Sequence, residues 1–414
     1  MSVDVDLPVI PLGEESTWQT LQEHLAKARA VSRFARTDSG LVFALRHADV
    51  DAILRSDEFE FGDLIASFGR YDGVFYDWWH RTISSFNPPQ HTRLRRLLGG
   101  AFTPKRLKPQ RQAITDIVNE ALDPCLEKGY VEAKDFAHVI PLRVMGDVLG
   151  IPREQHALYE DLTQMVAMGF QNGTAEDPEL VKSVDDAVIK LGEYSRTVIE
   201  EKRRNPGPDL ITAMLEERDG VERLTEQELL DHIIFMLFAG HDTTKSALPI
   251  AMMLLAKYPD QTELIRQNPD LAKDAVDEIT RFEPAVLFTT RQPITDIVWK
   301  GQFLPKGIPV GQCLVSAGRD EEGMPDADTF NIQRGVYRPI SFGSGTHFCL
   351  GVNLARLELE EAADPRHPYE QAGAGERAAV DAIQVGSWHQ GAAHSARGTL
   401  RTIACRERMT HSCG

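Results

Sequence analysis

Cysteine is scarce in this chain of 414 residues. The five cysteines, Cys125, Cys313, Cys349, Cys405 and Cys413, are scattered and include no CxxC pair. A small, odd and dispersed set argues against a secreted disulfide framework, and against zinc or iron–sulfur sites built from clustered cysteines. The sequence therefore predicts a reducing, cytoplasmic location.

Long hydrophobic runs and excess positive charge are missing as well. The uninterrupted apolar run 233–240 is far shorter than the ~20 residues that cross a bilayer, and the first residues show no basic, apolar leader. A formal net charge of −17 argues against binding to nucleic acid or to an anionic membrane. No flavin or NAD fingerprint occurs. We expect a monomer that binds neither membrane nor nucleic acid.

Helical periodicity dominates what is present. It runs from Gln90 to about Arg204 and again over Thr225–Lys257, where a capping box marks the start. Short β-like runs at Val31–Phe34 and Leu41–Leu45 predict a hairpin, and a second β-like stretch covers 285–311. Because these strands are segregated from the helices, the pattern predicts a mainly α fold with a minor β region.

The strongest chemical signal is the loop FGSGTHFCLG at 342–351. Three glycines permit positive φ and a close approach to a flat ligand. Cys349 stands just before a helix, where N–H groups and the helix dipole stabilise a thiolate. From these residues alone, Cys349 is a metal ligand, a nucleophile or an inert buried thiol.

Two further patterns lie on expected helices. The motif AGHDTT at 239–244 places glycine, aspartate and threonine in the middle of the longest helix, at a cost of ~1 kcal/mol for the glycine. Such a local conflict marks either a functional site or a kinked core helix. Glu278 and Arg281, at i and i+3, share one helix face, which by itself is typical of a solvated ion pair.

Together these motifs resemble those of the bacterial cytochromes P450, over about residues 10–363. Positions 342–351 match every fixed place of the family pattern FGxGxHxCLG. The resemblance implies a single-domain triangular fold, with haem b held between the long central helix and the Cys-loop helix. It makes Cys349 the axial thiolate of the haem iron, places Phe342 against the porphyrin and His347 near a propionate, and includes Gly351 in the haem loop.

The resemblance also assigns roles outside this loop. His91 and Arg95, at i and i+4, and Arg291 match the propionate partners of the family. Glu278 and Arg281, about 70 residues before the Cys loop, match its buried structural ExxR pair, with Arg334 as a third partner.

The AGHDTT motif matches the segment that crosses the oxygen-binding side of the haem. There Thr243 would offer a hydroxyl hydrogen bond and Asp242 would relay protons from solvent. Residues expected to contact substrate are Ala239, Val286, Leu287 and Phe288, and the aromatic stretch 59–86 matches a variable lid.

The implied reaction is that of a haem-thiolate monooxygenase, which inserts one atom of O2 into a lipophilic small molecule by hydroxylation or epoxidation. A ferredoxin and an NAD(P)H-dependent ferredoxin reductase would supply electrons on the face nearest Cys349, where Arg93, Arg96, Lys105 and Arg106 are candidate contacts. The alternatives are a peroxygenase that uses H2O2, a haem sensor or carrier, and a chain inactivated by its terminus.

That terminus departs from the family pattern. Pro365 and Pro368 end the last helix early, and residues 364–414 hold no lysine, no phenylalanine and one leucine, Leu400. This composition cannot build the strands that the family has there. We therefore expect a haem domain at 1–363 and, at 364–414, a disordered or frame-shifted tail.

Overall fold

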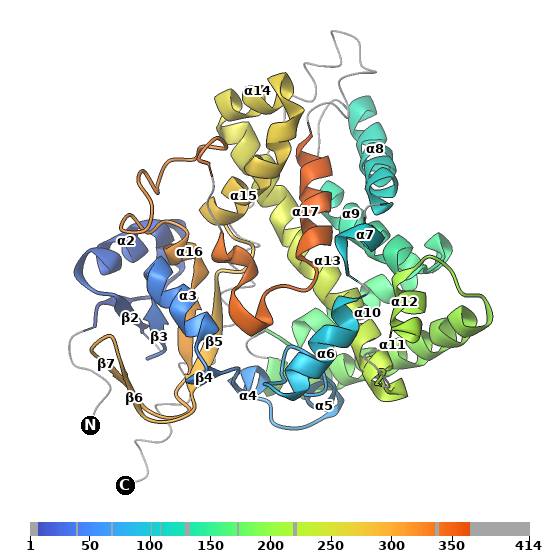
Figure 1. Cartoon of the computed structure of the whole chain (residues 1–414), viewed down its shortest axis with the longest axis horizontal. Coiled ribbons are helices and arrows are strands. Elements are labelled where there is room, and N and C mark those ends of the chain that lie inside the picture. Colours follow the sequence, from blue (N-terminus) through green and yellow to red (C-terminus); the bar gives the residue numbers. More distant parts are fainter. Residues whose placement is uncertain are drawn as a thin grey trace.

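The computed structural model describes residues 7–38, 40–67, 69–100, 102–107, 109–128, 133–171, 174–217, 222–335 and 339–364. In Figure 1 the strands lie at one corner of a triangular outline and helices occupy the rest. The tail predicted at 364–414 lies outside the described residues, apart from Asp364.

Helices form the larger part of the molecule, which confirms the mainly α prediction. They are α4 (Leu64–Ser67), α5 (Val74–Trp79), α6 (Gln90–Gly99), α7 (Pro104–Leu107), α8 (Gln110–Lys128), α9 (Ala133–Leu149), α10 (His156–Met168), α11 (Pro178–Arg204), α12 (Leu210–Glu216), α13 (Glu226–Lys257), α14 (Pro259–Gln267), α15 (Ala272–Phe282) and α17 (Val352–Ala363). Short 3-10 turns at Arg153–Gln155, Thr174–Glu176, Pro269–Leu271, Ile340–Phe342 and Gly345–His347 join some of them.

Within the described residues, the β region consists of one six-stranded sheet and one hairpin. The sheet has the order β1 (Val9–Ile10), β2 (Phe34–Thr37), β3 (Val42–Ala44), β8 (Val310–Cys313), β5 (Phe288–Pro293) and β4 (Phe59–Glu60), and the hairpin pairs β6 (Ile297–Trp299) with β7 (Gln302–Leu304). Helices α1 (Glu15–Gln19), α2 (Leu21–Val31), α3 (His47–Arg55) and α16 (Leu314–Ala317) complete this corner.

The predicted hairpin is confirmed with a corrected start. Strands β2 and β3 pair antiparallel, with Phe34 opposite Ala44. Val31 does not belong to the first strand, because it is the last residue of α2 and is 76% exposed. Ser32, which follows it, has the extended backbone that leads into the strand.

Helix α13 runs through the centre of the helical part, as Thr225–Lys257 predicted. The Thr225 hydroxyl accepts from the Glu228 N–H at 3.2 Å, and the Glu228 carboxylate accepts from the Thr225 N–H at 2.9 Å. This capping box satisfies two N–H groups that would otherwise lack partners. At 1.5 Å per residue, its 32 residues span roughly 48 Å.

The helices that pack on α13 fix the functional region. Helix α9 makes the most extensive contact with it, and α10, α11, α15 and α17 surround the rest.

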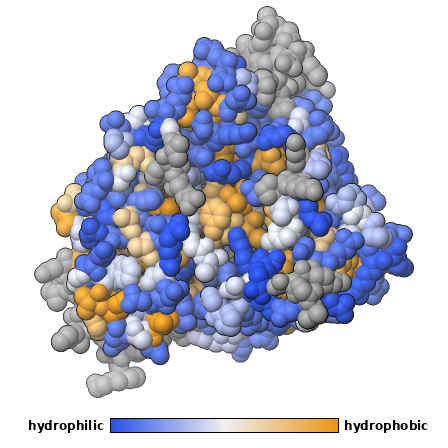
Figure 2. Space-filling model, in the orientation of Figure 1, coloured by the Kyte–Doolittle hydropathy of each residue, from blue (hydrophilic) through white to orange (hydrophobic). Residues whose placement is uncertain are grey.

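Most of the surface facing the viewer in Figure 2 is hydrophilic, with hydrophobic atoms visible in the middle of that face. Among the described residues, no helix has a stretch long and apolar enough to cross a membrane.

Candidate haem-thiolate site

The cysteine loop is shaped by two glycines in left-handed conformations. Gly343 has φ +74° and Gly345 has φ +68°, a region that other residues enter at a cost. A Cβ on Gly345 would also overlap the Leu54 carbonyl of α3. The Cys349 N–H donates to the Phe342 carbonyl at 2.9 Å, which folds the loop back on itself just before α17.

Burial and the neighbouring groups shift the pKa of the Cys349 thiol in opposite directions. Burial raises its pKa, whereas the backbone N–H groups of Gly351 and Val352 and the cation of Arg95 lower it. The helix start thus favours the thiolate, as the sequence predicted, but burial outweighs it in the protein alone. A bound metal cation would supply the missing stabilisation, because a coordinating thiol is deprotonated.

His347 of this loop lies among three basic side chains from other elements, which are His91 and Arg95 of α6 and Arg291 of β5. The rings of His91 and His347 lie 4.1 Å apart. Burial, together with the cations of Arg95 and Arg291, lowers the pKa of His91 to about 4. Burial, together with the same two arginines and His91, lowers the pKa of His347 to about 3.

The two arginines of this basic cluster have no carboxylate partner among the described residues. Arg291 is 5% exposed, donates to the Thr290 carbonyl at 2.8 Å and lies 5.1 Å from the ring centroid of Phe61. Burial lowers its pKa to about 10. Because buried cations without counter-ions are costly, the cluster fits a ligand that brings its own carboxylates, and haem brings two.

The middle of α13 presents the second half of the site. Thr243 is exposed, and its hydroxyl donates to the Ala239 carbonyl at 2.9 Å. The carboxylate of Asp242 accepts no hydrogen bond from the described residues, and burial raises its pKa despite the nearby Lys245. The Asp242 carboxylate can therefore still accept hydrogen bonds, and the Thr243 hydroxyl can still accept one.

Gly240 and His241 both lie where α13 packs against α9, a contact that the sequence did not reveal. A Cβ on Gly240 would overlap Met145 of α9, with Met145 Cε at 2.9 Å. His241 is 2% exposed, and its Nε2 has no hydrogen-bond partner. Its ring meets that of His138 edge-on at 5.6 Å, and His138 pairs with Glu160. The glycine thus permits close contact between α9 and α13.

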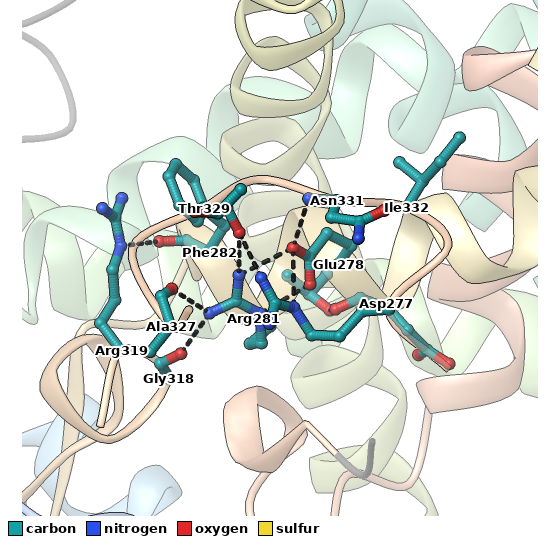
Figure 3. A network of polar contacts seen from close by, with 12 residues as sticks. Asp277, Glu278, Arg281, Phe282, Gly318, Arg319, Ala327, Thr329, Asn331 and Ile332 are labelled. Atoms are coloured by element: carbon teal, nitrogen blue, oxygen red, sulfur yellow. Dashed lines mark hydrogen bonds and ion pairs between the residues drawn. The ribbon is translucent and has the colours of Figure 1, made fainter. Parts of the chain in front are cut away.

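The ExxR pair is buried in a network that joins α15 to the long loop after α16 (Figure 3). Glu278 and Arg281 are 4% and 1% exposed. Arg281 donates to both carboxylate oxygens of Glu278, at 2.6 and 2.7 Å, and to the carbonyls of Gly318, Ala327 and Thr329. Arg334 donates to Glu278 at 3.3 Å, so the third partner comes from that loop.

The predicted substrate residues divide into two groups. Ala239 lies on the α13 face that carries Thr243, and Val286 is 41% exposed. Leu287 and Phe288 instead pack against the apolar cluster of the β region, and Phe288 lies 5.3 Å from Phe43. Their contacts within the protein are with the sheet and α2.

An aromatic group beside Ala239 was not predicted residue by residue. Phe170, two residues after α10, stacks on Phe238 of α13 at 4.9 Å and meets Trp79 edge-on at 4.8 Å. Phe75 meets Phe170 at 5.0 Å, and Phe235 lies 6.1 Å from Trp79. The aromatic richness of 59–86 signalled this group, but only the fold brings in residue 170.

Solved structures of other proteins have the same architecture. CalO2 superposes with a TM-score of 0.80 at 26% identity, covering 86% of this chain and 90% of that chain. CYP109E1 from Bacillus megaterium, in complex with testosterone, superposes with a TM-score of 0.73 at 26% identity, covering 84% and 91%.

Sequence comparison agrees with the superposition. Luteothin monooxygenase of Streptomyces thioluteus is 32% identical over 363 residues, which is 86% of this chain and 88% of that protein. The family model "Cytochrome P450" matches residues 17–362.

The chain therefore belongs to the cytochrome P450 family and is a bacterial member of it. It is a haem-thiolate monooxygenase whose cofactor is haem b. Like its bacterial relatives, it takes electrons from a redox partner.

Proposed function

We propose that Cys349 is the axial thiolate of the haem, and that the basic cluster of His91, Arg95, Arg291 and His347 binds the haem propionates. The observation that carries this proposal is the basic cluster itself, in which His91 and Arg291 are buried and Arg95 and His347 are half-buried. The cluster lacks acidic partners among the described residues and lies at the Cys loop. Phe342 and Gly351 complete the loop, with Phe342 against the porphyrin.

When bound, the haem supplies the activation of O2 by electrons, and the protein supplies binding, orientation and protons. Asp242 holds a proton at a higher pH than an ordinary aspartate, because burial raises its pKa. Thr243 stands one residue further along and offers its hydroxyl at the exposed face of α13. We propose that the two form the proton route to the reacting oxygen.

The proposed substrate is a lipophilic small molecule bound in front of Ala239 and Val286. The aromatic group of Phe170, Phe235 and Phe238 supports this proposal, because apolar rings bind apolar ligands. The solved structure of CYP109E1 with testosterone shows a lipophilic ligand in a protein of this fold. Whether the product is a hydroxyl or an epoxide depends on the ligand.

We propose a ferredoxin, reduced by an NAD(P)H-dependent ferredoxin reductase, as the electron donor. Phe348, next to Cys349, is 37% exposed, and Arg106 is exposed on α7, which packs against α17. Arg93 is a weaker candidate than the sequence indicated, because it pairs with Glu228 at 2.6 Å and with Glu222 at 3.5 Å. Arg96 is exposed, and the side chain of Lys105 lies outside the described residues.

Two further properties are proposed with this function. In the described part of the chain, Cys313 and Cys349 are free thiols, which supports a cytoplasmic location. We also propose that the protein acts as a monomer, which light scattering of the purified protein measures directly.

Turnover with isotopic oxygen tests the proposal. The haem-loaded protein is supplied with NADPH, ferredoxin reductase, ferredoxin and a panel of steroids and fatty acids under ¹⁸O2. We expect one ¹⁸O atom in the product, and a loss of rate of about 10²-fold in Asp242→Asn. Product formed with H2O2 but not with the ferredoxin system would favour a peroxygenase instead.

A further inference from the structure

The short helix α5 is fixed to α13 at its C-terminal end. The indole Nε1 of Trp78 donates to the Asp231 carbonyl at 3.2 Å. Just after the helix, Arg81 donates to the Asp231 carboxylate at 2.8 Å, and the Ile83 N–H donates to His232 Nε2 at 3.1 Å. These bonds attach this end of the segment to the first turns of α13.

The N-terminal end of α5 is held by a different helix through one carboxylate. Asp185 of α11 accepts from the Phe75 N–H at 2.7 Å, and the same oxygen accepts from Nη2 of Arg70. The guanidinium of Arg70 is 5% exposed and lies 5.2 Å from the centre of the Phe75 ring. In Figure 1, α5 and α11 lie at the lower edge of the molecule, where they pack together.

The backbone between Arg70 and Phe75 is bent tightly around this carboxylate. Gly73 has φ +97°, and a Cβ there would lie 2.6 Å from Arg70 Nη2 and 2.9 Å from Asp185 Oδ2. Val74 is 38% exposed, whereas the Phe75 ring is fully buried and packs on the end of α10. Asp185 therefore links this end to α11 through two hydrogen bonds to one carboxylate oxygen.

Aromatic contacts connect this attachment to the middle of α13. Phe75, whose N–H bonds to Asp185, meets Phe170 edge-on at 5.0 Å, and Phe170 stacks on Phe238 at 4.9 Å. A Cβ on Gly169 would lie 2.6 Å from the Phe75 ring, so that ring also presses on the end of α10. Phe238 directly precedes Ala239, on the side of α13 that carries Asp242 one turn later.

We propose that Asp185 is a positioning residue that controls ligand entry to the oxygen-side pocket of α13. Bound to Arg70 and to the Phe75 N–H, Asp185 holds segment 69–79 against Phe170, which in turn stacks on Phe238 of α13. Released, the N-terminal end of the segment swings away from α11 about the end that is fixed to α13. This inference rests on the proposed function, because it requires that ligands bind in front of Ala239.

The chain offers a matched control in the next residue. Asp186 lies beside Asp185 on α11, is exposed and pairs with Lys182 one turn earlier at 2.6 Å. Asp185→Asn and Asp186→Asn therefore make the same charge change on the same helix. Only the first removes a bond to the α5 segment.

The experiment is stopped-flow binding of 4-phenylimidazole to the haem-loaded protein, followed by the shift of the haem absorption band. We expect Asp185→Asn to raise both the association and the dissociation rate by about tenfold or more, as the loss of a charge-assisted hydrogen bond allows. Asp186→Asn should match the wild type. Equal rates in the two variants would overturn the proposal.

Arg70→Gln provides an independent variant if Asp185→Asn does not bind haem. Arg70→Gln should also raise the association and dissociation rates. The double variant should bind 4-phenylimidazole at rates close to those of either single variant, because both residues belong to one contact. A lower unfolding temperature with unchanged ligand rates would assign Asp185 a structural role only and refute the proposal. Failure of the proposed haem site would show separately, as an abnormal reduced carbon monoxide spectrum in the wild type.

Discussion

Replacing Glu278 by glutamine tests how the ion pair on α15 stabilises the fold. Glutamine keeps the shape but removes the charge that balances Arg281, which is 1% exposed and retains its bonds to three carbonyls. It also removes the charged acceptor for the Asn331 N–H at 2.7 Å and for Arg334. Breaking a buried pair on one side costs about 3–5 kcal/mol, a large share of a typical total of about 5–15 kcal/mol.

Urea unfolding of haem-loaded Glu278→Gln measures this loss. The control is Glu263→Gln, because Glu263 faces Arg266 at i+3 on α14 in a pair that is 50% and 35% exposed. A surface pair of this kind contributes about 0–1 kcal/mol. If Glu278→Gln lost no more stability than Glu263→Gln, the buried network would not support the fold in the way described.

Three other predictions concern α13 and the tail. Gly240→Ala should destabilise the protein by about 1 kcal/mol, because the overlap of the new Cβ with Met145 exceeds the gain in helix propensity. Gly192→Ala should instead stabilise α11, because a Cβ there would make only ordinary contacts. Thermal unfolding compares the two variants. Burial lowers the pKa of His241 to about 3, so the folded protein keeps it neutral while the unfolded chain binds a proton below pH ~6.5. The free energy of unfolding should therefore fall as the pH drops below ~6.5. His241→Leu should reduce the slope of that free energy against pH by about 1.4 kcal/mol per pH unit, measured by urea titrations at pH 5–6. An unchanged slope would contradict the low pKa of His241. Deleting residues 364–414 should leave the haem spectrum unchanged, and loss of haem would show that the tail belongs to the domain.

The sequence predicted the elements whose signals are local. The capping box at Thr225 and Glu228 located the start of α13 within one residue. Of the three glycines in the Cys loop, Gly343 and Gly345 have positive φ, whereas Gly351 has φ −85°. The family resemblance named Arg334 as a third partner of Glu278, which it is, but the bond from the Asn331 N–H to Glu278 was not predicted.

Contacts between distant segments could not be predicted in the same way. The overlap of Gly240 with Met145 and the bond from Phe75 to Asp185 join residues about a hundred positions apart, and neither leaves a pattern in its own segment. The same holds for Leu287 and Phe288, whose β-like sequence did not show that they pack toward Phe43.

The central claim is that Cys349 ligates the haem iron as a thiolate. The most direct measurement is the absorption spectrum of the dithionite-reduced protein under carbon monoxide, for the wild type and for Cys349→Ala. The account predicts a strongly red-shifted Soret band in the wild type and its loss in the variant. A wild-type spectrum without that shift, or a variant that keeps it, would contradict the assignment.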